Sequence, residues 1–134
     1  MDAPVRNLVW QRAAGRCEYC RLLQSDSPFR TFHIDHIRPR KHGGIDDPSN
    51  LALACDRCSL HKGYNLTGID PETEQIAPLF SPRTQAWEDH FRSDGARIAG
   101  ITATGRATVA VCEMNSARRL RLRSELQTSE ESSR

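Results

Sequence analysis

The chain has 134 residues, of which 37% are hydrophobic, 27% are charged and only 6% are aromatic. This length provides one compact domain of ordinary size and excludes two. The N-terminal residues contain no signal-peptide core, and no segment approaches the roughly 18 apolar residues of a membrane span. We therefore expect a soluble, cytoplasmic protein, in which thiols stay reduced and clustered cysteines bind metal.

The net charge of +2 has an unusual composition, because seventeen of the nineteen basic residues are arginine. Arginine is preferred where a planar fork must bind phosphate or carboxylate at two points. A GC-rich coding sequence would favour arginine equally, so composition alone does not establish phosphate binding.

Hydrophobic spacing and turn residues predict the elements in chain order. Apolar residues at positions 5, 8, 9 and 13 predict a helix over residues 5–14, which ends at Gly15. Alternation predicts a strand over residues 31–37, and a loop follows from 43 to 50. Residues 68–76 predict two short strands around a Pro-Glu-Thr turn, and residues 106–114 and 116–127 predict two helices.

The same patterns suggest how the chain is organised. We interpret residues 1–126 as a single domain, with a core over 17–66 and a C-terminal extension over 67–126. Residues 127–134 are polar and have no apolar anchor. They are therefore expected to form a disordered tail.

Eight of the ten cysteines and histidines lie between residues 17 and 61. Two Cys-x-x-Cys turns in this region let four thiolates converge on one tetrahedral Zn²⁺. Their cysteines are Cys17, Cys20, Cys55 and Cys58. The 34 residues between the turns exceed the gap of a plain zinc ribbon, so a substructure must fold between them. The alternative is two unrelated turns that use cysteine as a small apolar residue. Cys112, far along the chain, is a spare.

Asp35 and His36 lie side by side within this insert, on the predicted strand. Adjacent side chains of a strand point to opposite faces, so Asp35 and His36 can have different chemical roles. A neutral histidine suits a general base that activates water, and a carboxylate oxygen suits Mg²⁺.

The motifs over residues 17–63 follow one another in a characteristic order. Cys-x-x-Cys is followed by Asp35-His36-Ile37 with Pro39, Gly43-Gly44, Asn50-Leu51, Leu53, Cys55-x-x-Cys58 and Lys62-Gly63. This order resembles the HNH endonucleases of the zinc-containing, four-cysteine type. Residues 65–71 and 105–108 resemble a small bacterial subgroup of that family. The resemblance implies an α+β fold: a ββα-metal core stapled by a four-cysteine zinc site, an N-terminal helix, an additional short hairpin and C-terminal helices.

The resemblance also implies roles for individual residues. His36 would be the general base that deprotonates the attacking water. Asp35 would bind a single divalent ion, Mg²⁺ or Mn²⁺, that holds the scissile phosphate and stabilises the leaving 3′ oxygen. The amide of Asn50 would brace the loop and orient the base. His33 and His42 are then expected to be bystanders.

Ser59 departs from the family pattern, in which a histidine or asparagine at this position supplies the other protein ligand to the catalytic ion. Helix geometry turns His61 roughly 200° from Ser59, so His61 is not expected to replace it. Three explanations stay open. The serine hydroxyl binds the ion, directly or through water; the enzyme is weakened or inactive; or the residue is a deliberate substitution made to trap a nuclease.

Contacts with DNA are expected mainly at the phosphate backbone, with low sequence specificity. The basic residues beside the expected site are Arg38, Arg40, Lys41, Arg57 and Lys62. A second basic run near the C-terminus is as much a solvated helix surface as a DNA contact; it contains Arg118, Arg119, Arg121 and Arg123. We therefore expect a metal-dependent DNA endonuclease that hydrolyses phosphodiester bonds. The alternative is a zinc-stabilised DNA-binding module that has lost catalysis at Ser59.

Overall fold

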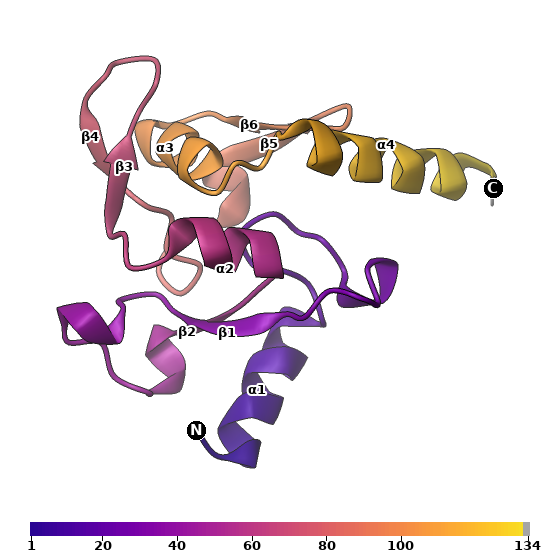
Figure 1. The fold of residues 1–134 in the computed structure, drawn as a ribbon. Helices are drawn as coiled ribbons and strands as arrows, with labels where there is room; N and C mark the ends of the chain where they lie inside the picture. Colours follow the sequence, from indigo (N-terminus) through magenta and orange to yellow (C-terminus); the bar gives the residue numbers. More distant parts are fainter. Residues whose placement is uncertain (133–134) are drawn as a thin grey trace.

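The computed structural model describes residues 1–132, which form four α-helices and three two-stranded antiparallel sheets (Figure 1). None of these helices is long and apolar enough to cross a membrane. The α+β class expected from the sequence is confirmed. In chain order the elements are α1 Ala3–Ala13, β1 His33–His36, β2 Leu51–Ala54, α2 Asp56–Lys62, β3 Thr67–Ile69, β4 Ile76–Pro78, β5 Phe91–Asp94, β6 Arg97–Gly100, α3 Ala103–Val111 and α4 Ala117–Ser132.

Helix α1 begins and ends on residues suited to those positions. The Asp2 carboxylate accepts a hydrogen bond from the first turn, and Ala14 and Gly15 take left-handed conformations that end the helix. Arg12 donates from the last turn to the carbonyl of Leu51 at 2.6 Å. The N-terminal helix is thereby fixed to the strand that leads into the second cysteine turn.

The β1–β2 hairpin lies at the centre of the N-terminal half, between α1 on one side and α2 on the other (Figure 1). His33 pairs with Ala54 and His36 with Leu51, in antiparallel register. Every residue of β2 is buried, whereas in β1 only Asp35 is buried, His33 is exposed, and Ile34 and His36 are partly buried. A strand covered on both faces needs apolar residues throughout, and Leu-Ala-Leu-Ala supplies them.

The C-terminal extension contains two hairpins, although the sequence predicted only one. The β3–β4 pair lies where two short strands were expected. The β5–β6 hairpin was missed because Phe91 and Ile98 are its only buried apolar residues, which is too few to give a clear alternation. Its two-residue turn begins at Gly95, whose φ of +58° suits the tight connection. Asn115 then fixes β6 through both backbone groups of Ile98.

A buried ion pair joins the two segments that resemble the bacterial subgroup. Asp70, fully buried after β3, accepts two hydrogen bonds of 2.9 Å each from the Arg106 guanidinium of α3. This pairing holds the pKa of Asp70 well below its usual range. The β3–β4 hairpin is therefore attached to α3 by a charged contact as well as by packing.

Helix α4 continues through residues 127–132, which the sequence placed in a disordered tail. The Gln127 amide donates to the carbonyl of Gly95 at 2.9 Å, a polar anchor that no hydrophobic pattern reveals. The rest of the expected tail, residues 133–134, lies outside the described residues.

Candidate functional site

Four buried cysteines form the candidate metal cluster found within residues 1–132, and their sulfur atoms all lie within 4.8 Å of one another. Cys17 and Cys20 lie on the turn after α1, and Cys55 and Cys58 lie at the start of α2. The Cys20 and Cys55 sulfurs are 3.7 Å apart. Zn–S bonds of about 2.3 Å give a tetrahedron with an edge of about 3.8 Å, so the donor set fits Zn²⁺.

Backbone hydrogen bonds shape both cysteine turns. The amide of Cys20 donates to the Cys17 sulfur, and the amide of Cys58 donates to the Cys55 sulfur, each at 3.4 Å. Hydrogen bonds from the neighbouring thiols, that of Cys17 above all, lower the pKa of Cys20 well below its usual range. Burial raises the pKa of Cys17, and hydrogen bonds with other thiols, that of Cys112 above all, raise the pKa of Cys58. A metal requires thiolates, so metal binding at this cluster would release protons from the cysteines whose pKa is raised.

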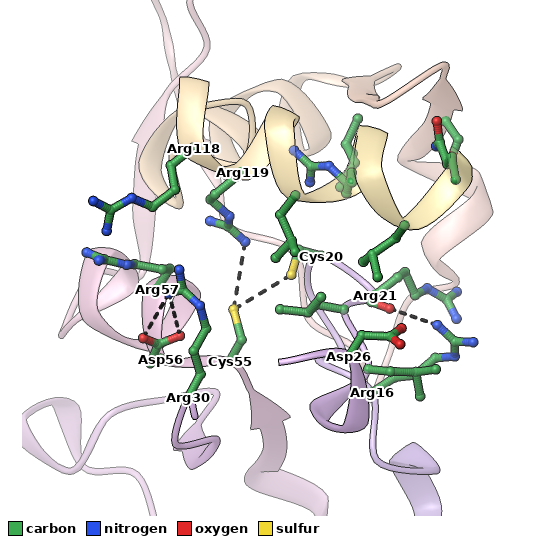
Figure 2. Close-up of a pocket in the computed structure, with 18 of the residues that line it drawn as sticks. Arg16, Cys20, Arg21, Asp26, Arg30, Cys55, Asp56, Arg57, Arg118 and Arg119 are labelled. Atoms are coloured by element: carbon green, nitrogen blue, oxygen red, sulfur yellow. Dashed lines mark hydrogen bonds and ion pairs between the residues drawn. The ribbon is translucent and has the colours of Figure 1, made fainter. Parts of the chain in front are cut away.

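Arg119 reaches the cluster from α4, and its guanidinium lies 3.2 Å from the Cys58 sulfur and 3.7 Å from that of Cys55. Figure 2 shows the side chain directed at Cys55. Burial alone would lower the pKa of Arg119, but the negative charges on Cys58 and Cys20 raise it above its usual range. The arginine therefore offsets thiolate charge and attaches α4 to the second cysteine turn, a role that was not predicted from the sequence.

Asp35 is the buried residue of β1, and its side chain is 8% exposed. Oδ2 accepts a hydrogen bond from the Tyr19 hydroxyl at 2.8 Å and pairs with the Lys62 ammonium at 3.0 Å. Burial raises the pKa of Tyr19, and the Asp35 charge adds to that effect. The carboxylate therefore lies between the first cysteine turn and the last turn of α2.

Lys62 is only 2% exposed, although the sequence placed it among the DNA contacts. Besides pairing with Asp35, its ammonium donates to the carbonyl of His36 at 3.1 Å. A lysine held in this way joins α2 to β1 and is not available to a phosphate at the surface. The position beside the second cysteine turn was predicted from the chain, but the direction of the side chain depends on how α2 packs.

Replacing Lys62 by methionine should destabilise the protein by about 3–5 kcal/mol, because Asp35 is left as a buried charge without its partner. Urea unfolding measures the loss, and the double variant with Asp35→Asn should recover part of it. An unchanged unfolding free energy, with a weaker salt dependence of DNA binding, would instead support the surface contact predicted from the sequence.

His36 points to the other face of β1 and is 18% exposed. Its Nε2 lies 2.7 Å from Asp46 Oδ1, and the same carboxylate accepts hydrogen bonds from Arg40 at 2.8 and 2.9 Å. The hydrogen bond with His36 contributes most to holding the pKa of Asp46 below its usual value, and the hydrogen bonds from Arg40 add to it. Sequence analysis missed Asp46, because nothing in the spacing of a loop aspartate indicates which histidine it meets.

Asn50 braces the loop between the two strands. Its Oδ1 accepts from the amide of Arg38 at 2.8 Å, and its Nδ2 donates to the carbonyls of Arg38 and Ile45 at 3.0 and 2.9 Å. Gly43 has a φ of +84°, and a Cβ at Gly44 would lie 1.6 Å from the Arg38 carbonyl oxygen. The Gly43-Gly44 pair therefore allows the loop to fold back against Asn50.

The remaining predicted residues lie at different places. Arg38, Arg40 and Lys41 are exposed in the loop that follows His36. Ser59 is partly buried on α2, and its hydroxyl forms no hydrogen bond within residues 1–132. His61 pairs with Glu113 at 2.9 Å, in agreement with its exclusion as a ligand. Arg57 lies apart from the hairpin, in a cavity beside α4.

A β-hairpin, a short helix and a buried four-cysteine cluster that could hold a metal ion thus form a ββα unit. Residues 17–65 match the family model of HNH endonucleases, so the chain contains an HNH endonuclease domain. Comparisons with curated proteins and with solved structures gave no significant match.

Proposed function

We propose that this protein is a metal-dependent DNA endonuclease that hydrolyses phosphodiester bonds with low sequence specificity. The observation that supports the proposal best is the pairing of His36 with Asp46 on the face of β1 opposite to Asp35. The hairpin belongs to the segment that matches the HNH family, whose members are nucleases. The charges and the geometry of the hairpin thus support a nuclease function of the kind that HNH family members have.

His36 acts as the general base in this proposal. Asp46 orients the imidazole and stabilises the imidazolium that forms when His36 takes a proton from the attacking water. Arg40 fixes Asp46 in turn, and Asn50 holds the backbone of the loop that carries these groups. The base is therefore positioned before substrate binds by one hydrogen-bonded neighbour, Asp46, which Arg40 holds in turn.

Asp35 and Ser59 are the residues that would hold Mg²⁺ or Mn²⁺. Asp35 Oδ2 is taken by Tyr19 and Lys62, and Oδ1 has no hydrogen-bond partner within residues 1–132. A carboxylate oxygen and a hydroxyl are donors of the type that Mg²⁺ accepts, so the chemistry of these two side chains suits such an ion. When bound, it would stabilise the charge on the leaving 3′ oxygen. Lys62 repels a cation at this position, so we expect weak binding.

The exposed side chains of Arg38 and Lys41 lie in the loop after His36 and are proposed to contact the DNA backbone. We further propose that residues 1–126 act as one domain, with the core over 17–66. The four-cysteine cluster would hold a structural zinc, which suits a reducing compartment such as the cytoplasm.

Nicking of supercoiled plasmid tests the proposal. The zinc-loaded protein with Mg²⁺ or Mn²⁺ should convert supercoiled plasmid to open circles, and omission of the divalent ion should stop the reaction. The His36→Ala variant, purified identically, measures contaminating nuclease. If the wild-type protein nicks no faster than this variant, the endonuclease proposal is wrong.

The second candidate function is a DNA-binding module without catalysis. The pairing of Asp35 with Lys62 and the serine at the third motif position both favour it. The Ser59→Asn variant separates the two candidates, since nicking that appears only in this variant would assign the defect to the third ligand.

A further inference from the structure

A cavity of about 310 Å³ lies away from the hairpin site, between the first zinc turn, the start of α2 and α4 (Figure 2). Its wall contains more than twice as many arginines as acidic residues. The acidic residues are Asp26, Asp56 and Glu130, and the arginines are Arg16, Arg21, Arg30, Arg57, Arg118, Arg119 and Arg123. Such a wall attracts anions unless its charges are already paired.

Most of these arginines are already engaged. Arg119 meets the thiolates, Arg123 donates to a backbone carbonyl, and Arg16 does the same. Arg30 pairs with Asp56 at 3.2 Å, and Arg21 pairs with Glu88 at 3.0 Å. These side chains support the cavity wall and have little capacity left for a ligand.

Arg57 and Arg118 are the exceptions, because neither guanidinium makes a hydrogen bond or an ion pair in the part of the chain that the structure describes. Figure 2 shows the two side chains on the same side of the cavity, one from α2 and one from α4. Two positive charges on the same side of a cavity repel each other, and a bound anion offsets that repulsion.

The zinc turns fix the distance between these two helices. Arg57 precedes Cys58 and Arg118 precedes Arg119, and the Arg119 guanidinium lies 3.2 Å from the Cys58 sulfur. The backbones that carry Arg57 and Arg118 are therefore held in place by that contact before any ligand arrives. Two guanidinium forks carried by backbones that are held in this way suit the oxygens of a phosphate group.

We propose that Arg57 and Arg118 form a phosphate clamp that binds the DNA backbone at a phosphate other than the one that is cut. DNA as the partner rests on the proposed function, whereas the clamp itself rests on the cavity. Arg57 lies in the first turn of α2 and Lys62, which pairs with Asp35, lies in the last, so the clamp and the hairpin occupy opposite ends of the helix. Arg118 lies outside residues 17–65, so the clamp needs the C-terminal extension.

The salt dependence of DNA binding tests the clamp. Fluorescence anisotropy would follow a labelled duplex titrated with the zinc-loaded full chain, without added Mg²⁺, from 50 to 200 mM salt. Losing one phosphate contact should reduce the slope of log K against log salt by about 0.9 in the Arg57→Ala/Arg118→Ala double variant. The matched control is Arg121→Ala, an exposed arginine of α4 outside the cavity, which should leave the slope unchanged.

Each outcome decides the proposal. An unchanged slope in the double variant, or no duplex binding by the wild-type protein, overturns the clamp. A protein that fails to nick plasmid but shows the predicted change in slope refutes the endonuclease and retains the clamp. Zinc content and melting temperature should match the wild type, because neither guanidinium has a partner to lose; if the double variant does not fold, Arg118→Ala alone provides the test.

Discussion

Replacing His36 by alanine should lower the rate of plasmid nicking by about 100-fold to 10,000-fold, the range that a positioned general base contributes. Asp46 holds the His36 imidazole at 2.7 Å, and an imidazole positioned in this way can serve as a general base. Single-turnover nicking of supercoiled plasmid, with enzyme in excess, measures the chemical step directly.

His42 provides the matched control. It lies in the same loop, but its Nε2 contacts the carbonyl of Tyr64 at 3.0 Å rather than an acidic residue. The His42→Ala variant should therefore nick DNA at close to the wild-type rate. Equal losses in the two variants would show that the loop matters only structurally, and His36 would not be the base.

Removing the zinc should unfold the core of the protein. Apparent binding free energies of structural zinc in small domains are roughly 10 kcal/mol or more, which is comparable to the whole stability of a domain of this size. The four sulfurs join the turn after α1 to the start of α2, and the hairpin lies between them. Chelation, or the Cys58→Ala substitution, should therefore remove the cooperative thermal transition seen by circular dichroism.

Two measurements make this expectation specific. Freshly purified protein should contain one zinc per chain, and a content well below one would contradict the assignment of the four cysteines as zinc ligands. Cys112→Ala is the control, because Cys112 is buried but is not one of the four clustered ligands. This variant should keep its zinc and should lose only the roughly 1 kcal/mol typical of a small change in the core.

The arginine-rich C-terminal helix shows why sequence patterns gave only part of the answer. Residues 119 and 123 share a helix face, which the spacing predicts. Sequence analysis offered a solvated surface or a DNA contact for the run, yet Arg119 is buried against thiolates and Arg123 donates to the carbonyl of Ala96. A charge that stabilises another element has no periodic signal, because its partner comes from a distant part of the chain.

The ion pairs of the hairpin follow the same rule. The order of motifs located Asp35, His36 and Asn50, and strand alternation put the first two on opposite faces. Tyr19, Lys62 and Asp46 complete the arrangement, and each was either unassigned or given another role. Their contacts span ten or more residues of sequence, so they depend on how α2, the cysteine turn and the loop pack against β1.

The sequence alone determined the α+β class, the four cysteines that cluster and could hold zinc, and the hairpin that carries Asp35 and His36, because cysteine spacing, strand alternation and an ordered motif are local properties of the chain. Tertiary structure decided which charges are used and which are free. It buried Lys62 against Asp35, placed Arg119 on the thiolates, and left Arg57 and Arg118 beside a cavity without a partner among residues 1–132. The charge of an arginine or a lysine is fixed by its type, but its partner is fixed only by the folded positions of distant segments.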